Sequence, residues 1–207
     1  MKISYAITVC NELKEITELT NFLQSRIEEE DEIIIQYDTN GVTKEVSDFL
    51  TIFGEINRQT KIVSFPLNKD FATFKNNLKK NCSGDYIFQI DADEIPTEYL
   101  MQNLKTILES NNVDIVFVPR VNTVNGLTEA HIKGWGWRVD EKGWVNFPDY
   151  QTRIYKNTTD VEWFGKVHER ISGYNTFANF PAEERFSLYH HKQIERQDKQ
   201  NNFYNNL

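Results

Sequence analysis

The chain has 207 residues, of which 39% are hydrophobic and 13% aromatic, and it carries a formal net charge of −8 at pH 7. This length and apolar content suffice for one full hydrophobic core, so we expect a single domain over residues 1–207. The acidic charge and the scattered lysines and arginines argue against a nucleic-acid partner, because affinity for a phosphate backbone comes from clustered basic side chains.

We expect the sequence to hold no segment for export or membrane insertion. Its apolar runs fall short of the ~18–20 residues of a membrane span, and its opening Met-Lys-Ile-Ser-Tyr-Ala-Ile-Thr-Val is typical of a strand rather than of a signal peptide. Its two cysteines, Cys10 and Cys82, form neither a metal-binding spacing nor a disulfide framework. We therefore expect a cytoplasmic protein without a membrane span.

Strands and helices are predicted to alternate through about residue 120. Runs rich in β-branched and aromatic residues predict strands at 3–9, 33–37, 61–65, 86–90 and 115–118. Apolar residues three or four positions apart predict helices between them, which begin near Asn11, Val42, Asp70 and Pro96. This alternation is typical of the α/β class, with a mostly parallel central sheet flanked by helices.

The chain changes character after residue 120. Residues 134–137 and 143–148 are rich in tryptophan and glycine and show no helical period. Short strands are predicted at 151–155 and 166–171, and a polar helix from Glu195 to the end. We interpret this half as an irregular Trp/Gly-rich C-terminal extension of the same domain. Four tryptophans either pack in its core or offer flat faces to an acceptor sugar; they are Trp135, Trp137, Trp144 and Trp163.

Polar residues follow three of the predicted strands. They are Asn11 with Glu12, then Asp38, and then the pair Asp91 and Asp93. In doubly wound sheets ligands bind beyond the carboxyl ends of the strands, so these side chains are expected to meet in one site. Neighbouring carboxylates repel each other unless a cation lies between them, and Mg²⁺ or Mn²⁺ prefers such oxygen ligands. The alternative is that Asp91 and Asp93 cap the helix that follows.

Motifs in several parts of the chain resemble those of a single protein family. Residues 71–77 carry Lys-Asn on a predicted helix, and residues 83–94 lead through Gly-Asp to Ile-Asp-Ala-Asp-Glu. Residues 151–155 are Gln-Thr-Arg-Ile-Tyr, and residues 165–169 are Gly-Lys-Val-His-Glu. Together with the first strand, these segments resemble the family 2 glycosyltransferases of the GT-A fold. The segment after residue 188 also resembles a branch of that family met in viral and bacterial genomes.

The resemblance implies a nucleotide-sugar site. Asn11 and Glu12 would hold the nucleotide, Asp38 would accept hydrogen bonds from the base ring, and Lys75 and Arg153 would supply positive charge for the phosphates. For Lys75 the alternative is an ordinary lysine on a helix surface. Family members usually carry Asp-x-(Gly/Ser)-Ser-x-Asp after the second strand. This chain keeps only the first of those acids, so the base that is bound there is not specified.

The resemblance also implies a metal site of Mn²⁺ or Mg²⁺. Asp93 would be the direct ligand, Asp91 would reach the metal or the ribose, and His190 would be the third ligand. For His190 the alternative is a surface histidine on a strand.

A catalytic base is the last element that the resemblance implies. Glu169 would take the proton of the acceptor hydroxyl, and His168 would orient the site or contact the diphosphate. The alternatives are that Glu169 forms an ion pair with Arg170 and that Asp149 is the base.

These features lead us to expect a metal-dependent, inverting glycosyltransferase. It would move a sugar from a UDP- or GDP-sugar, bound by residues 1–120, to a hydroxyl of a glycan or glycoconjugate on the side of residues 121–207. One alternative is a sugar nucleotidyltransferase, although the loop after the first strand lacks the glycines that phosphate binding usually needs. Another is a carbohydrate-binding module of the same fold that has lost its chemistry.

Overall fold

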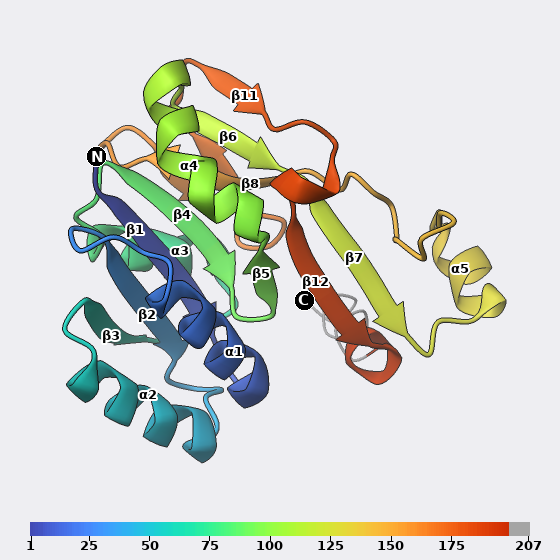
Figure 1. Ribbon diagram of the computed structural model, residues 1–207. Coiled ribbons are helices and arrows are strands. Elements are labelled where there is room, and N and C mark those ends of the chain that lie inside the picture. The colour runs from blue at the N-terminus through green and yellow to red at the C-terminus, as the bar shows by residue number, and fades with distance from the viewer. Residues whose placement is uncertain (199–207) are drawn as a thin grey trace.

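The chain is built around a seven-stranded sheet with the strand order β11-β6-β8-β4-β1-β2-β3 (Figure 1). A computed structural model describes residues 1–198. Within this sheet all strands run parallel except β8, which is antiparallel to its neighbours β4 and β6. The mostly parallel α/β sheet that the alternating pattern predicts is confirmed. The strands are β1 (Ile3–Val9), β2 (Glu32–Asp38), β3 (Thr60–Phe65), β4 (Tyr86–Asp91), β6 (Ile115–Val118), β8 (Gln151–Lys156) and β11 (Phe177–Asn179).

Helices cover both faces of this sheet (Figure 1). They are α1 (Leu13–Gln24), α2 (Lys44–Ile56), α3 (Phe71–Lys80) and α4 (Glu98–Asn111). Because successive side chains of a strand point to opposite faces, β1 supplies both halves of the core. Ile3, Tyr5 and Ile7 pack in the cluster of α1, α2 and α4, whereas Ala6 packs in the cluster of α3 and Trp163.

The chain turns after β4 instead of entering a helix directly. Glu94–Pro96 form the short strand β5, and α4 begins at Glu98, slightly later than expected. The N-cap of α4 is Thr97, whose hydroxyl accepts a hydrogen bond from the backbone N–H of Leu100. The interpretation of Asp91 and Asp93 as caps of this helix is therefore wrong.

A second sheet, with the order β5-β12-β7, brings distant residues to the end of β4. Its strand β12 (Leu188–Gln193) pairs antiparallel with β5 and parallel with β7 (Arg120–Asn125). In this register His190 lies opposite Glu94 on one side and Asn122 on the other. The long-range pairing thus places a histidine next to the Asp-x-Asp segment.

The region between β7 and β8 contains a helix that the sequence patterns did not indicate. It is α5 (Glu129–Trp135), which starts with a capping box between Thr128 and His131 and lies at one margin of the molecule (Figure 1). Its C-cap, Gly136, adopts a left-handed conformation (φ 66°) that glycine tolerates best. No side chain of α5 is fully buried, so capping and aromatic contacts stabilise it rather than a core face.

The segment expected as a strand at 166–171 is mostly a loop, so that prediction is wrong. Residues 165–169 connect β9 (Glu162–Phe164) to β10 (Arg170–Ser172) in an antiparallel hairpin. A 3₁₀ helix (Glu184–Phe186) precedes β12. Residues 194–198 are helical as expected, and the rest of the predicted C-terminal helix lies outside the described residues. Within residues 1–198, no helix combines the length and the apolar character that a membrane crossing requires.

Candidate active site

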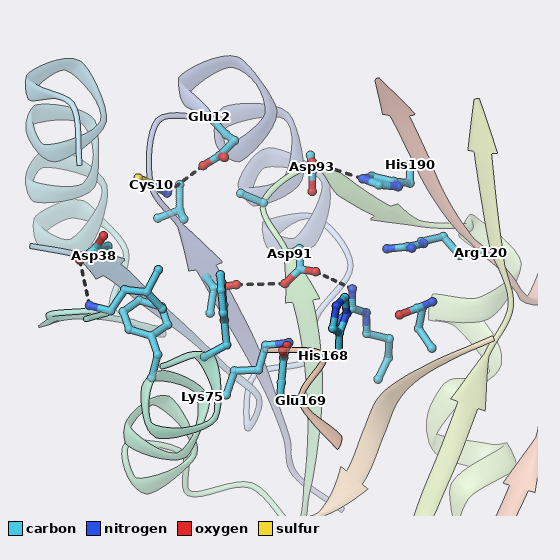
Figure 2. A pocket seen from close by; sticks show the side chains of 18 of the residues that line it. Cys10, Glu12, Asp38, Lys75, Asp91, Asp93, Arg120, His168, Glu169 and His190 are labelled. Carbon is cyan, nitrogen blue, oxygen red and sulfur yellow. Dashed lines mark hydrogen bonds and ion pairs between the residues drawn. The ribbon is translucent and has the colours of Figure 1, made fainter. Parts of the chain in front are cut away.

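The carboxyl ends of β1, β2 and β4 border a pocket of about 480 Å³ (Figure 2). Side chains from the second sheet and from the 165–169 loop also line it. Every residue predicted for the site lines this pocket except Asn11, which is exposed and lies outside the lining. The predicted residues that the fold does bring together are Glu12, Asp38, Lys75, Asp91, Asp93, Arg153, His168, Glu169 and His190.

Asp91, the last residue of β4, is held between a hydroxyl and a guanidinium group (Figure 2). Its Oδ1 accepts a hydrogen bond from the Thr8 hydroxyl (3.0 Å), and its Oδ2 forms an ion pair with Arg153 Nη2 (2.5 Å). Burial opposes the ionisation of Asp91, but the charge of Arg153, supported by Lys75, more than offsets burial and lowers the pKa of Asp91 well below its usual range. Both oxygens of Asp91 are thus engaged, which leaves Asp93 better placed to bind a cation.

Arg153 belongs to a buried chain of charges. Its Nη2 also pairs with Glu94 Oε1 (2.5 Å), and that fully buried carboxylate pairs in turn with Arg120 Nη1 (2.9 Å). Arg120 Nη2 then contacts Asp149 Oδ2 (2.8 Å). In the structure the guanidinium of Arg153 positions Asp91, while its contact with phosphates stays a prediction.

Replacing Arg153 with methionine should lower the free energy of unfolding by about 3–5 kcal/mol, the usual cost of removing one partner of a buried ion pair. The substitution removes the cation that Asp91 and Glu94 share. Chemical denaturation measures the loss. The matched control is Arg170→Met, at an exposed arginine that forms no ion pair within residues 1–198. Equal stability of the two variants would show that the buried pair does not stabilise the fold.

Asp93 faces His190 across the pocket (Figure 2). The distance from Asp93 Oδ2 to His190 Nε2 is 3.3 Å, and Arg196 Nη2 lies 3.3 Å from the same oxygen. Burial opposes the ionisation of Asp93, but its contacts with His190 and Arg196 more than offset burial and lower the pKa of Asp93 to about 2. Asp93 is therefore a carboxylate at neutral pH.

The ring of His190 is oriented by Asn122. Asn122 Nδ2 donates to Asp149 Oδ2 (2.6 Å), so the amide oxygen of Asn122 faces His190 Nδ1 (2.7 Å), and that nitrogen donates to it. The other ring nitrogen, Nε2, lies within hydrogen-bond distance of Asp93 Oδ2. Burial outweighs the attraction of Asp93 and lowers the pKa of His190.

The facing atoms of Asp93 and His190 fit a divalent cation. A carboxylate oxygen and a ring nitrogen 3.3 Å apart have a proton or a cation between them, and a divalent cation can take the place of the proton. Neighbouring ligand atoms around one octahedral ion lie about 3 Å apart, since each bond is about 2.1 Å. Within residues 1–198, no three His, Cys, Asp or Glu side chains form a complete metal site by themselves. Water and phosphate oxygens would have to complete the shell, as is usual for Mg²⁺.

The loop between β9 and β10 carries His168 and Glu169 to the pocket. Gly165 (φ 90°) and His168 (φ 52°) both adopt left-handed conformations that turn the loop. The carbonyl oxygen of Lys166 accepts a hydrogen bond from the backbone N–H of Phe71 (2.9 Å) at the start of α3. This contact attaches the loop to the main sheet layer and fixes the position from which Glu169 enters the site.

Within residues 1–198, Glu169 forms an ion pair with Lys75 and not with its neighbour Arg170. The distance from Glu169 Oε1 to Lys75 Nζ is 2.5 Å, and this ammonium group lies 4.4 Å from the centre of the Trp163 ring. Lys75 is buried, so it is not an ordinary surface lysine. Asp149, the other candidate base, already accepts hydrogen bonds from three side chains on its two oxygens. Glu169 is therefore the freer of the two carboxylates.

Asp38 lies at the far end of the pocket from Asp93. Its Oδ1 accepts hydrogen bonds from the backbone N–H groups of Asn40 (3.0 Å) and Leu67 (2.9 Å). Both bonds use the same oxygen, so Oδ2, which has no hydrogen-bond partner within residues 1–198, can accept a hydrogen bond from a ligand. This geometry is consistent with the predicted contact to a base ring.

The side chain of Glu12 turns back and binds the backbone of the loop that follows β1. Its Oε2 accepts hydrogen bonds from the backbone N–H groups of Cys10 (2.7 Å) and Asn11 (2.9 Å), and its Oε1 pairs with Arg196 Nη2 (2.7 Å). Arg196 thus links Glu12 to Asp93, a role that the sequence did not indicate. These contacts shape the rim of the pocket, which Cys10 and Glu12 line.

Comparison with known proteins identifies the family. The sequence model described as "Glycosyl transferase family 2" matches residues 4–186. The chain belongs to glycosyl transferase family 2. Among solved structures, this family 2 chain is similar to S. aureus TarS 1-349 in complex with UDP, with a TM-score of 0.65 and 15% sequence identity over 92% of this chain and 60% of that one.

A second similar structure is S. aureus TarS 1-349 in complex with UDP-GlcNAc. Its TM-score is 0.64 at 16% identity, with 93% of this chain and 59% of that chain covered. The family 2 chain therefore spans about 60% of the length of the TarS fragments that it matches. The similarity shows that the fold is of the GT-A type, as the motifs led us to expect. Comparison with curated proteins gave no match.

Proposed function

We propose that the chain is a metal-dependent, inverting glycosyltransferase that moves a sugar from a UDP- or GDP-sugar to a hydroxyl of a glycan or glycoconjugate. The observation that carries the proposal is that one pocket holds both a cation-binding pair and a separate, less engaged carboxylate. The pair is Asp93 with His190, and the carboxylate is Glu169. Membership of family 2 and the UDP-GlcNAc complex of TarS support the same choice of donor class.

The residues divide the work along the pocket. Asp38 would accept a hydrogen bond from the base ring, and Asp93 with His190 would hold the metal ion. When bound there, a divalent ion would neutralise the charge that develops on the leaving diphosphate. The base-ring contact thus comes from residues 1–120, whereas Glu169 and His190 come from the later part of the chain.

Glu169 acts on the acceptor. Its carboxylate accepts the proton of the acceptor hydroxyl while that oxygen forms a bond to the anomeric carbon of the donor. The bond from this carbon to the diphosphate breaks, and the diphosphate oxygen keeps the electron pair. Attack opposite the leaving group inverts the configuration at the anomeric carbon. Lys75 holds Glu169 in place for this step.

The rival assignment as a nucleotidyltransferase is less well supported. Such an enzyme binds triphosphate with backbone N–H groups of the loop after its first strand. Here the N–H groups of Cys10 and Asn11 already donate to the side chain of Glu12. Those donors are therefore occupied within the protein.

A panel of nucleotide sugars with Mn²⁺ tests the proposal. We expect at least one UDP- or GDP-sugar to release free nucleoside diphosphate slowly in the absence of acceptor, and chelation by EDTA should stop the release. Calorimetry should show that the corresponding nucleoside diphosphate binds only when Mn²⁺ or Mg²⁺ is present. If no nucleotide binds in a metal-dependent way, the chain is not an enzyme of this kind.

A further inference from the structure

A second cavity, of about 350 Å³, adjoins the proposed donor pocket. The two cavities share part of their lining, and the shared residues are Lys75, Gln151, Arg153, His168 and Glu169. The wall between them therefore contains the proposed catalytic base. A molecule in the second pocket can approach Glu169 from the side opposite the nucleotide. The volume lies within the range of small-molecule sites, roughly 300–1,000 Å³.

The remaining walls of the second pocket are rich in aromatic side chains, which differ in their burial and in their hydrogen bonds to the rest of the fold. Trp163 is buried, donates a hydrogen bond to the Tyr155 hydroxyl (3.2 Å) and has Lys75 over its ring, so it belongs to the core. Tyr150 donates its hydroxyl to the carbonyl oxygen of Phe180 (2.8 Å). Both of these rings are thus already committed to the fold.

Tyr174 is the free aromatic residue of this pocket. Its side chain is exposed (36%), and its hydroxyl makes no hydrogen bond with any residue of the part that the structure describes. Its ring packs edge-on against Phe177, with the ring centres 6.4 Å apart, and Phe177 packs edge-on against Phe117 at 6.0 Å. Phe117 lines the pocket, while Phe177 is 60% exposed outside it. The three rings form a continuous aromatic strip that leads from the pocket to the surface.

Contact of these aromatic rings with water is unfavourable, and a ligand that covers the rings removes that contact. Exposed apolar patches on soluble proteins commonly mark binding sites. A pyranose ring presents C–H groups on its faces and hydroxyl groups at its rim, so one molecule can cover an aromatic face and still satisfy polar neighbours. Arg170 lines the same pocket, is exposed and has no ion pair or hydrogen bond through its side chain within residues 1–198. It supplies such a polar neighbour, with donors suited to hydroxyl oxygens.

We propose that the second pocket binds the acceptor, with a terminal pyranose ring against Tyr174 and Phe117 and one hydroxyl directed at Glu169. The proposal rests on the proposed transferase function. It deepens that function by specifying a carbohydrate acceptor that enters along the strip from Phe177 to Tyr174. Ten of the thirteen residues that line this pocket lie after residue 120, on the side of the chain expected to face the acceptor.

A third cavity, of about 270 Å³, is the competing place for the acceptor. It lies on the other side of Arg120 and His190 and is lined in part by Trp137 and Asp149. Asp149 Oδ1 accepts from Gln151 (3.0 Å), and its Oδ2 accepts from two further side chains. A carboxylate with both oxygens occupied is a poor proton acceptor, so an acceptor bound there lacks a base. The second pocket, in contrast, is lined by Glu169, which can act as the base.

Saturation-transfer NMR with methyl glycosides tests the proposal. The probes are the methyl β-glycosides of glucose, galactose and N-acetylglucosamine, each added to the protein with UDP and Mg²⁺. We expect at least one of them to bind, and Tyr174→Ala to weaken its binding about fivefold, because the substitution removes the aromatic face that the sugar ring covers. Tyr174→Phe, which keeps the ring, should lose much less. Trp137→Ala, in the third pocket, should leave the affinity unchanged.

The affinity for UDP separates this proposal from the one on which it rests. UDP binding should be the same in the parent protein and in all three variants, and thermal unfolding verifies that each variant is folded. Absence of UDP binding to the parent protein would contradict the transferase function itself. With UDP binding intact, the acceptor proposal is overturned if no probe binds, or if Trp137→Ala weakens probe binding and Tyr174→Ala does not.

Discussion

Replacing Asp93 with alanine should lower kcat/KM for sugar transfer at least about a thousandfold, which corresponds to about 4 kcal/mol of lost transition-state stabilisation. Of the two acids of the Asp-x-Asp segment, Asp91 is engaged by Thr8 and Arg153 on its two oxygens. Asp93 keeps one oxygen, Oδ1, without a hydrogen bond or ion pair inside residues 1–198, and its other oxygen faces Nε2 of His190. Removal of Asp93 therefore removes the negative charge that a metal ion needs.

The loss should be seen in metal binding before it is seen in turnover. Calorimetric titration of Mn²⁺ in the presence of UDP should show binding to the parent protein and none to Asp93→Ala. Asp48→Ala, at an exposed acid on α2 that is paired only with Lys44 within the helix, removes the same charge far from the pocket and should leave both quantities unchanged. Retention of metal-dependent transfer by Asp93→Ala would remove Asp93 from the metal site.

The first half of the fold was predictable because its determinants are local. Each strand of β1 to β4 is a short apolar run, and each intervening helix has an apolar face. The spacing of apolar residues alone therefore distinguishes the strands from the helices. The alternation then implies a parallel sheet, and the parallel sheet implies a site at its carboxyl end. Asp38, Asp91 and Asp93 could be placed in one pocket by this reasoning without any knowledge of the tertiary contacts.

The second half was less predictable because long-range pairing decides it. The three-stranded sheet joins β5, β7 and β12, which lie far apart in the sequence, and none of them carries a pattern that names its partner. Glu94 was visible only as the last acid of its motif, and Arg120 carried no signal at all. Their pairing with each other and with Arg153 follows from the fold alone.

Asn11 was predicted to lie in the site, and this prediction was wrong. It follows β1 directly, so its position in the sequence placed it at the ligand edge, but the side chain is exposed and lies outside the pocket. Glu12 turns back onto the loop and binds its backbone N–H groups instead. The end of a strand can be predicted from the sequence, whereas the direction of each side chain in the following loop cannot, because it depends on local hydrogen bonds.

Replacing Glu169 with glutamine should lower kcat about 10²- to 10⁴-fold, the range that general base catalysis commonly contributes. The affinity for the nucleotide sugar should not change. The amide keeps the shape of the side chain and retains an oxygen that can accept from Lys75, but it cannot take a proton from the acceptor. Glu162→Gln, at an exposed acid of the same hairpin, makes the same chemical change away from the pocket and should leave kcat unaltered.

The comparison with Asp149→Asn decides between the two candidate bases. Asp149 fixes the amide of Asn122, and Asn122 orients the ring of His190, so Asp149→Asn should weaken metal binding as well as turnover. Glu169→Gln, in contrast, should leave the affinity for Mn²⁺ and UDP unchanged and reduce only the chemical step. If Glu169→Gln turns over at the parent rate while Asp149→Asn is inactive with normal metal affinity, the base is Asp149. The split between binding and turnover therefore distinguishes a residue that takes the proton from one that orients a metal ligand.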